Sequence, residues 1–380
     1  RYNRIGAAGI ALCAVLGCEP SPLGESWVTP RPLGEELETM QPESVAAAMQ
    51  AGEDGSTARH TTRFDTPTGE IALSDALAAA LMNNPELRGF AYDVRAAEAQ
   101  ALQAGLWPNP ELEVEAENIG KDDPGNALDP LEATVRLSQP ILTANRIEKR
   151  TRVAEFERDL AAWDYEAKRL DVFTSVVQRF VALLAAQRRL QVTRDTFDLA
   201  QQVHESVARQ VEAGAISPVQ SKRSRVELSA ARIDLQRTER TVQSAKHALA
   251  ETWGGDSPRF GRVVGDLHDI DSVPTLDALT QFVAHNPDVA RWASRMAQQQ
   301  AEVELAEARA WPNVKVGAGV KYFNEADDAA GIISFGLPLP IFDRNQGEIL
   351  AARYAKGKTA SQQRAAEVRA RSMLGRAYHD

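Results

Sequence analysis

Four glutamates occupy every second position in the stretch WPNPELEVEAEN, residues 107–118. They are Glu111, Glu113, Glu115 and Glu117, with Leu112, Val114 and Ala116 between them. Because side chains alternate between the two faces of an extended strand, this spacing predicts a short strand with one acidic and one apolar face. Carboxylates gathered on one face attract cations and repel anions. They also keep the wet side of a strand hydrated, and both interpretations stay open.

Three further stretches alternate in the same way. WPNVKVGAGVKY, residues 311–322, starts with the same three letters and places Lys315 and Lys321 opposite its valines. EATVRLSQPIL places Arg136 opposite Val135 and Leu137. The expected strands cover about residues 110–118, 132–140, 313–322 and 331–338. We expect Arg136, Lys315 and Lys321 to share the polar face with the glutamates and to offset part of their charge.

No other group of residues has the spacing of a catalytic or metal site. The six histidines are scattered, without a His-x-x-x-His pair, a cysteine cluster or a glycine-rich phosphate loop, so we expect neither an enzyme nor a cofactor. The formal net charge of -10 and the pI near 5.3 argue against a nucleic-acid partner.

The N-terminal stretch RYNRIGAAGIALCAVLGC has the charged start and short apolar run of a secretory signal peptide. It ends in Val15-Leu16-Gly17-Cys18, which resembles the bacterial lipobox and implies that Cys18 is acylated. A chance cysteine near a signal peptide is the alternative. No other stretch approaches the roughly 18 apolar residues of a spanning helix, so we expect strands to make any membrane crossing.

Long helices follow the strands. Between Pro140 and Gly214 there is neither proline nor glycine, which predicts one very long helix. Apolar residues in steps of three and four predict its coiled-coil seam: Val153, Phe156, Leu160, Trp163, Ala167, Leu170, Thr174, Val177, Val181 and Leu184. A second helix returns from Val219 to Trp253. The tip of this helical hairpin is expected at Glu212, Ala213, Gly214, Ala215, Ile216, Ser217, Pro218, Val219 and Gln220.

The order of helix, strands and long helix then repeats. Asn84-Pro85, Trp107-Pro108-Asn109 and Pro140 return as Asn286-Pro287, Trp311-Pro312-Asn313 and Pro340, at offsets of 202, 204 and 200 residues. This spacing indicates a tandem duplication. The expected organisation is a signal peptide (1–17), an extended tether (18–70), a first repeat (71–253), a linker (254–275) and a second repeat (276–380) that is truncated within its own long helix.

Four amphipathic strands of eight to ten residues have the length and period of a transmembrane β-barrel, with apolar faces toward lipid and polar faces toward a lumen. Four strands cannot close a barrel, and open sheet edges are not tolerated in lipid, so several protomers would share one barrel. A soluble sheet with one packed face and one wet face is the alternative.

Together, the lipobox, the Asn-Pro helix starts, the doubled Trp-Pro-Asn, the tip AGAISPVQ and LPLPIFDRNQGEI resemble the TolC-like outer-membrane efflux proteins, in particular the acylated heavy-metal branch of CzcC and CusC. The resemblance runs from about Ser74 to Asp380. It implies a mainly α protein with a small β part, and a homotrimer with four strands per protomer in a shared 12-stranded barrel. Long helical hairpins would form a periplasmic tunnel.

The resemblance also implies a function. The chain would be a passive duct in the outer membrane, anchored by Cys18, that exports heavy-metal cations from the periplasm with a periplasmic adaptor and a proton-driven RND-type pump. The adaptor would dock at residues 212–220, where Gln220 replaces the acid of many relatives. Glu111, Glu113, Glu115 and Glu117, with Arg136, Lys315 and Lys321, would face the barrel lumen. A drug-efflux outer-membrane factor and a lipid-anchored periplasmic adaptor are the alternatives.

Overall fold

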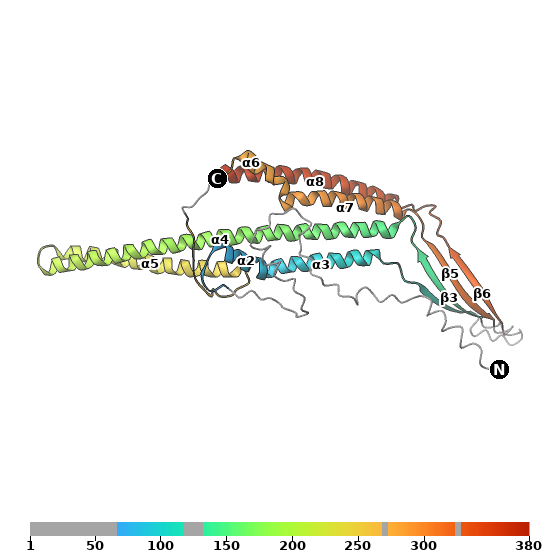
Figure 1. Ribbon diagram of the computed structural model, residues 1–380, viewed down its shortest axis with the longest axis horizontal. Coiled ribbons are helices and arrows are strands. Elements are labelled where there is room, and N and C mark those ends of the chain that lie inside the picture. The colour runs from blue at the N-terminus through green and yellow to red at the C-terminus, as the bar shows by residue number, and fades with distance from the viewer. Residues whose placement is uncertain (1–66, 118–131, 268–272, 324–327, 380) are drawn as a thin grey trace, which may run out of the picture. The chain divides into compact units, whose positions relative to one another are not determined.

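The computed structural model describes residues 67–117, 132–267, 273–323 and 328–379 (Figure 1). The expected signal peptide, Cys18 and nearly all of the expected tether lie outside these residues. The described part is mainly helical with two small sheets, as the sequence predicted.

One 67-residue helix, α4, organises the first repeat, and it has the length that the absence of proline and glycine predicted. The helices of this repeat are α2 (Leu73–Asn83), α3 (Pro85–Gly105), α4 (Arg146–Glu212) and α5 (Pro218–Glu251). Helix α4 contacts α2, α3 and α5, and Figure 1 shows α3 and α5 beside different halves of it. The hairpin of α4 and α5 is therefore confirmed.

The second repeat has the same order with a shorter start. Its helices are α6 (Leu276–Thr280), the 3-10 helix η1 (Gln281–His285), α7 (Pro287–Arg309) and α8 (Gln346–His379). Helix α7 packs between α4 and α8. Asn84 caps α3 and Asn286 caps α7, each followed by proline in the first turn, as the paired Asn-Pro steps predicted.

The four expected strands are confirmed and form one antiparallel sheet in the order β2-β3-β5-β6. Their bounds are β2 (Glu111–Glu117), β3 (Glu132–Ile141), β5 (Val314–Phe323) and β6 (Asp328–Gly336). The contact between β3 and β5 joins the two repeats, with Arg136 opposite Gly319 and Val135 opposite Val320. In Figure 1 the sheet lies at one end of α3, α4, α7 and α8.

A second, parallel sheet was not predicted. Strand β1 (Gly69–Ile71) pairs with β4 (Phe260–Val263), which lies inside the segment expected to be a linker. Strands of three and four residues are too short to show a period of two, so the glycine- and proline-rich composition hid them. Ile71, Phe260 and Val263 are buried and place this sheet in the main core.

The core lies where α4, α5, α2 and the small parallel sheet meet. Its members on α4 are Val172, Val176, Phe180, Leu183 and Leu184. The predicted seam is confirmed in this part of α4 at Leu184, which is buried, but it is wrong at Leu170, Thr174 and Val181, which are exposed. Apolar residues occur on two neighbouring faces of α4, and the packing of α2, α5 and β4 selects the face that starts at Val172.

The expectation that no helix is apolar enough to span a membrane also needs correction. An 18-residue window of α4 reaches a mean hydropathy of 1.3 with few charges, so α4 meets the length and composition of a spanning helix. Core helices meet the same test, and α4 supplies Val176, Phe180 and Leu183 to the core described above. We therefore attribute part of this hydropathy to core packing.

Candidate functional site

The predicted glutamate face exists and is shared by all four strands. Across β2 and β3, Glu113 is opposite Arg136 and Glu115 is opposite Thr134. The pairing continues through β5, where Lys321 is opposite Thr134. Because directly opposed residues share one face of a sheet, the glutamates, Arg136, Lys315 and Lys321 lie on the same side, as the sequence predicted.

Lys315 reaches across a whole strand to the glutamates. It lies on β5, and β3 separates β5 from β2. Its Nζ nevertheless lies 2.6 Å from Oε2 of Glu111 and 3.1 Å from Oε1 of Glu113. Ser138 of β3 is almost completely buried on this face. We attribute the burial of Ser138 to the Lys315 side chain that crosses over it.

Two glycines of β5 leave the polar face of the sheet without side chains at their positions. A Cβ atom on Gly319 would lie 2.4 Å from the carbonyl oxygen of Val135, and one on Gly317 would lie 2.6 Å from the Ser334 hydroxyl. A side chain at position 319 would require the backbone of β3 to shift, and one at position 317 would require the Ser334 hydroxyl to move. Because Gly317 and Gly319 have no side chains, the polar face between Lys315 and Lys321 is open, and both lysine side chains lie in this space.

The other two cations are paired as well. Arg136 Nη1 lies 3.2 Å from Glu113 Oε2. Lys321 Nζ lies 3.0 Å from Glu117 Oε2 and also contacts Glu132. In the described part of the chain Glu115 has no ion-pair partner. The face is therefore a network of charges in which carboxylates outnumber cations, and the sequence alone could not assign the ion-pair partners.

The opposite face of the sheet is apolar and uncovered. Its large side chains are 37–88% exposed in the protomer. They are Leu112, Val114, Val135, Leu137, Val316, Val320, Tyr322, Ile333 and Phe335. A contiguous apolar surface of this kind on a folded protein marks contact with a membrane or with another protein.

Two arginines in the first turns of α4 join this helix to the ends of α3 and α7. Arg146 donates to the carbonyls of Ala308, Arg309 and Trp311 at the end of α7. Arg150 donates to the carbonyls of residues 104 and 106 at the end of α3, at 2.7 and 2.9 Å. These bonds satisfy carbonyls that a helix leaves unpaired at its C-terminus, where positive charge is favourable.

These arginines were not among the functional residues predicted from the sequence. Positive side chains at the start of a helix oppose its own dipole, so the run RIEKRTR at the start of α4 was the signal that they serve other helices. Burial lowers the pKa of the Arg146 guanidinium, and the nearby Arg309 acts in the same direction. Arginine stays protonated in proteins, so Arg146 keeps its charge at this joint.

The hairpin tip folds as the residue types predicted. Gly214 has a φ of 70° just after the end of α4, and Pro218 occupies the first turn of α5. Ser217 caps α5 by accepting from the backbone N–H of Val219 at 3.4 Å. The tip residues are exposed except for a half-buried Ile216. The tip is thus a defined turn whose outer surface is free in the protomer.

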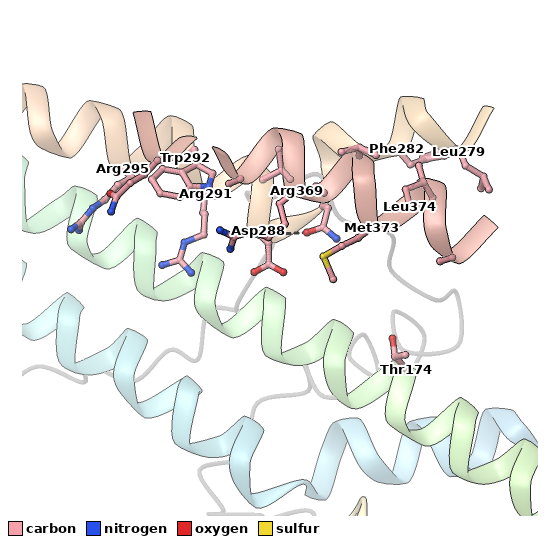
Figure 2. A pocket seen from close by; sticks show the side chains of 17 residues that line it. Thr174, Leu279, Phe282, Asp288, Arg291, Trp292, Arg295, Arg369, Met373 and Leu374 are labelled. Carbon is pink, nitrogen blue, oxygen red and sulfur yellow. Dashed lines mark hydrogen bonds between the residues drawn. The ribbon is translucent and has the colours of Figure 1, made fainter. Parts of the chain in front are cut away.

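A groove of about 1220 Å³ opens between α7 and α8 (Figure 2). Apolar and arginine side chains from α4, α6, η1, α7 and α8 line it, including Leu279, Phe282, Trp292, Arg369 and Met373. Figure 2 shows Leu279, Phe282, Met373 and Leu374 together at one end of the groove and Asp288, Arg291 and Arg295 along α7. Among the described residues, no group of three or more histidine, cysteine, aspartate or glutamate side chains could hold a metal ion.

In the described residues a β-hairpin precedes the long hairpin of α4 and α5, and a second β-hairpin precedes the long helix α8. The crystal structure of CusC superposes on the chain with a TM-score of 0.65 over 84% of this chain and 77% of that chain, at 17% identity. This likeness shows the fold. Residues 76–255 match the family described as Outer membrane efflux protein, and the chain belongs to this family.

Curated relatives within the family carry metal-resistance names. The chain is 32% identical over 284 residues, 75% of its length, to the cobalt-zinc-cadmium resistance protein CzcC of Cupriavidus metallidurans. It is 24% identical over 288 residues, 76% of its length, to the nickel-cobalt-cadmium resistance protein NccC of Alcaligenes xylosoxydans xylosoxydans. The chain spans 66% and 64% of the length of these two relatives.

Proposed function

We propose that the chain is one protomer of a passive exit duct in the outer membrane, through which cations leave the periplasm. The observation that carries this proposal is the four-stranded sheet, with its charged face, its uncovered apolar face and its place at the end of long helices. An apolar outer face and a polar inner face on alternating residues are what a membrane barrel requires.

Several copies must share the barrel, because four strands are too few to close one and lipid does not tolerate an open sheet edge. With four strands per protomer, a homotrimer gives the 12-stranded barrel that the family resemblance implies. The apolar face then contacts outer-membrane lipid, and Cys18 anchors the chain by its acyl group. The polar face lines the lumen.

The duct performs no chemistry, so its energy comes from partners. In this proposal an inner-membrane RND-type pump and a periplasmic adaptor complete the system, and the adaptor docks at residues 212–220. The exposed, well-defined turn at Gly214 and Pro218 supports this role. The chain itself is unlike an adaptor, because β2 and β3 precede the long hairpin and the same order recurs at β5, β6 and α8.

Heavy-metal cations are the proposed substrate. The support is the names of the relatives, CzcC and NccC, and the charge of the sheet. The polar face carries the four glutamates of β2 with Glu132 and Asp328, against three cations, Arg136, Lys315 and Lys321. Three copies therefore give a lumen of net negative charge, which favours cations.

Conductance of the purified protein in planar bilayers tests the proposal. Glutamine at positions 111, 113, 115 and 117 together leaves three cations per protomer against Glu132 and Asp328, so we expect the reversal potential in a salt gradient to shift from cation toward anion preference. Aspartate at the same four positions keeps the charge and serves as the control. An unchanged reversal potential would refute the role of the glutamates, and the absence of any channel would refute the duct.

A further inference from the structure

The sheet ends in two edges that have no partner strand in the described chain. Strand β2 pairs only with β3, and β6 pairs only with β5. Building on the proposed duct, we infer that the β6 edge of one copy joins the β2 edge of the next, with Phe335 opposite Val114 and Ser334 opposite Glu115. This register follows from the correspondence between the strands of the two repeats.

Matching contacts align β2 with β5 at an offset of 204 residues. The carbonyl of Pro108 accepts from the Gln139 side chain, and the carbonyl of Pro312 accepts from Thr143. Likewise Arg150 binds the carbonyl of Ala104, and Arg146 binds that of residue 308. In each pair the two carbonyls lie 204 residues apart. Glu111 on β2 therefore corresponds to Lys315 on β5.

Strand pairing then aligns β3 with β6. Glu111 is opposite Ser138, and its counterpart Lys315 is opposite Gly336. Gly336 is thus the counterpart of Ser138, 198 residues later, although Pro140 and Pro340 in the sequence are 200 residues apart. Two extra residues therefore lie between β6 and α8, within the segment LPLP. The strand pairing, and not the proline spacing, sets the register of the sheet.

The pairing of β3 with β5 inside the protomer is the template for the pairing of β6 with β2 between copies. Ser138 of β3 is opposite Gly317 of β5, whose counterpart on β2 is Glu113. Gly336 of one copy therefore lies opposite Glu113 of the next, and the antiparallel run brings Phe335 to Val114. Phe335 and Val114 both belong to the apolar face. The faces of the two sheets consequently continue across the junction.

Barrel geometry agrees with this register. Within one copy a row of opposed residues runs from Glu113 through Arg136 and Gly319 to Ile332. The inferred junction continues it to Glu117 of the next copy, four residues further along β2. Three copies accumulate about twelve residues of stagger, equal to the number of strands, and barrels with this equality tilt their strands by about 36°. Outer-membrane barrels tilt by about 35–45°.

The junction also places a second strand beside Glu115. The described β6 residues on the polar face are Asp328, Ala330, Ile332, Ser334 and Gly336. They include no cation, so the adjoining β6 strand itself brings no ion-pair partner to β2. Glu115 then lies between Thr134 of its own chain and Ser334 of the neighbour. Glu115 therefore stays without an ion pair on the polar face, and we expect it to contribute to the cation preference of the lumen.

Disulfide trapping in the full chain, in outer membranes, tests the register. Val114→Cys with Phe335→Cys, and Glu115→Cys with Ser334→Cys, form two neighbouring opposed pairs, and one pair in every two of an antiparallel ladder is close enough for a disulfide. We expect at least one double variant to shift from the monomer to a covalent trimer on a non-reducing gel. Val114 and Phe335 are exposed, so replacing them leaves the protomer core intact.

Two controls separate a wrong register from a wrong function. Single-cysteine variants should stay monomeric on the gel, because the two edges are different strands. Val114→Cys with Leu337→Cys tests the register that the proline spacing predicts, and preferential trapping of that pair would overturn the inferred register while leaving the duct intact. A protein that forms no channel and no trimer would instead refute the proposed function.

Discussion

The joint at Asn84-Pro85 and the joint at Asn286-Pro287 start from the same local sequence and differ in what packs on them. At the first, Asn84 accepts from the Leu87 N–H at 2.9 Å and donates to the Thr252 carbonyl at 2.8 Å. Gly254 adopts a φ of 74°, and a Cβ there would meet the Pro85 ring at 2.9 Å. The end of α5 thereby closes the first joint.

At the second joint the cap forms alone. Asn286 accepts from the Asp288 N–H at 2.9 Å, while Phe282 just before it stays 62% exposed beside the groove of Figure 2. No described helix takes the place that α5 has at the first joint. The Asn-Pro step therefore determines where each helix begins. A packed core forms at that position only where a returning helix covers it.

The largest expected contrast is between a buried core side chain near the first joint and an exposed side chain at the second joint. Leu183 is fully buried against α2, α5 and β4, so Leu183→Ala should lower the free energy of unfolding by about 3 kcal/mol. Phe282→Ala removes an exposed side chain and should cost about 0.5 kcal/mol or less. Urea unfolding of the helical circular dichroism signal in detergent measures both. Equal losses would show that the second joint is packed as tightly as the first.

A smaller contrast concerns glycine. Gly254→Ala forces a Cβ onto a left-handed backbone and against Pro85, so we expect a loss of about 2 kcal/mol in the same unfolding measurement. The matched control is Gly357→Ala in α8, where no atom lies within 4 Å of the added Cβ. Because alanine favours a helix more than glycine, this control should gain about 1 kcal/mol. A neutral Gly254→Ala would mean that α5 does not close the joint.

Local signals in the sequence predicted much of the fold. The absence of proline and glycine predicted α4, and alternation predicted β2, β3, β5 and β6. What failed depends on distant contacts. In the main core, the buried face of α4 includes Val172 and not Leu170 because α2 and α5 pack on that face. Strand β4 was missed because it is too short to alternate.

In the candidate site too, the features set by the local sequence were predicted and the contacts between distant segments were not. The strand period predicted that Lys315 and Glu113 share a face, because alternation needs only the local chain. It could not predict that Lys315 crosses β3 to reach β2, because that contact depends on the strand order and on the side-chain-free positions of Gly317 and Gly319. The capping role of Arg146 likewise needs the end of α7, 162 residues away in sequence.

The finest test compares the two caps directly. Asn84→Ala removes both the cap of α3 and the bond to Thr252, so we expect a loss of about 2 kcal/mol, half from each. Asn286→Ala removes the cap alone and should cost about 1 kcal/mol. Serine at each position caps a helix without the amide donor. Asn84→Ser should therefore recover only the cap share, while Asn286→Ser should recover nearly all of its loss. If serine rescued both positions equally, the bond between α3 and the end of α5 would contribute nothing to the difference between the joints.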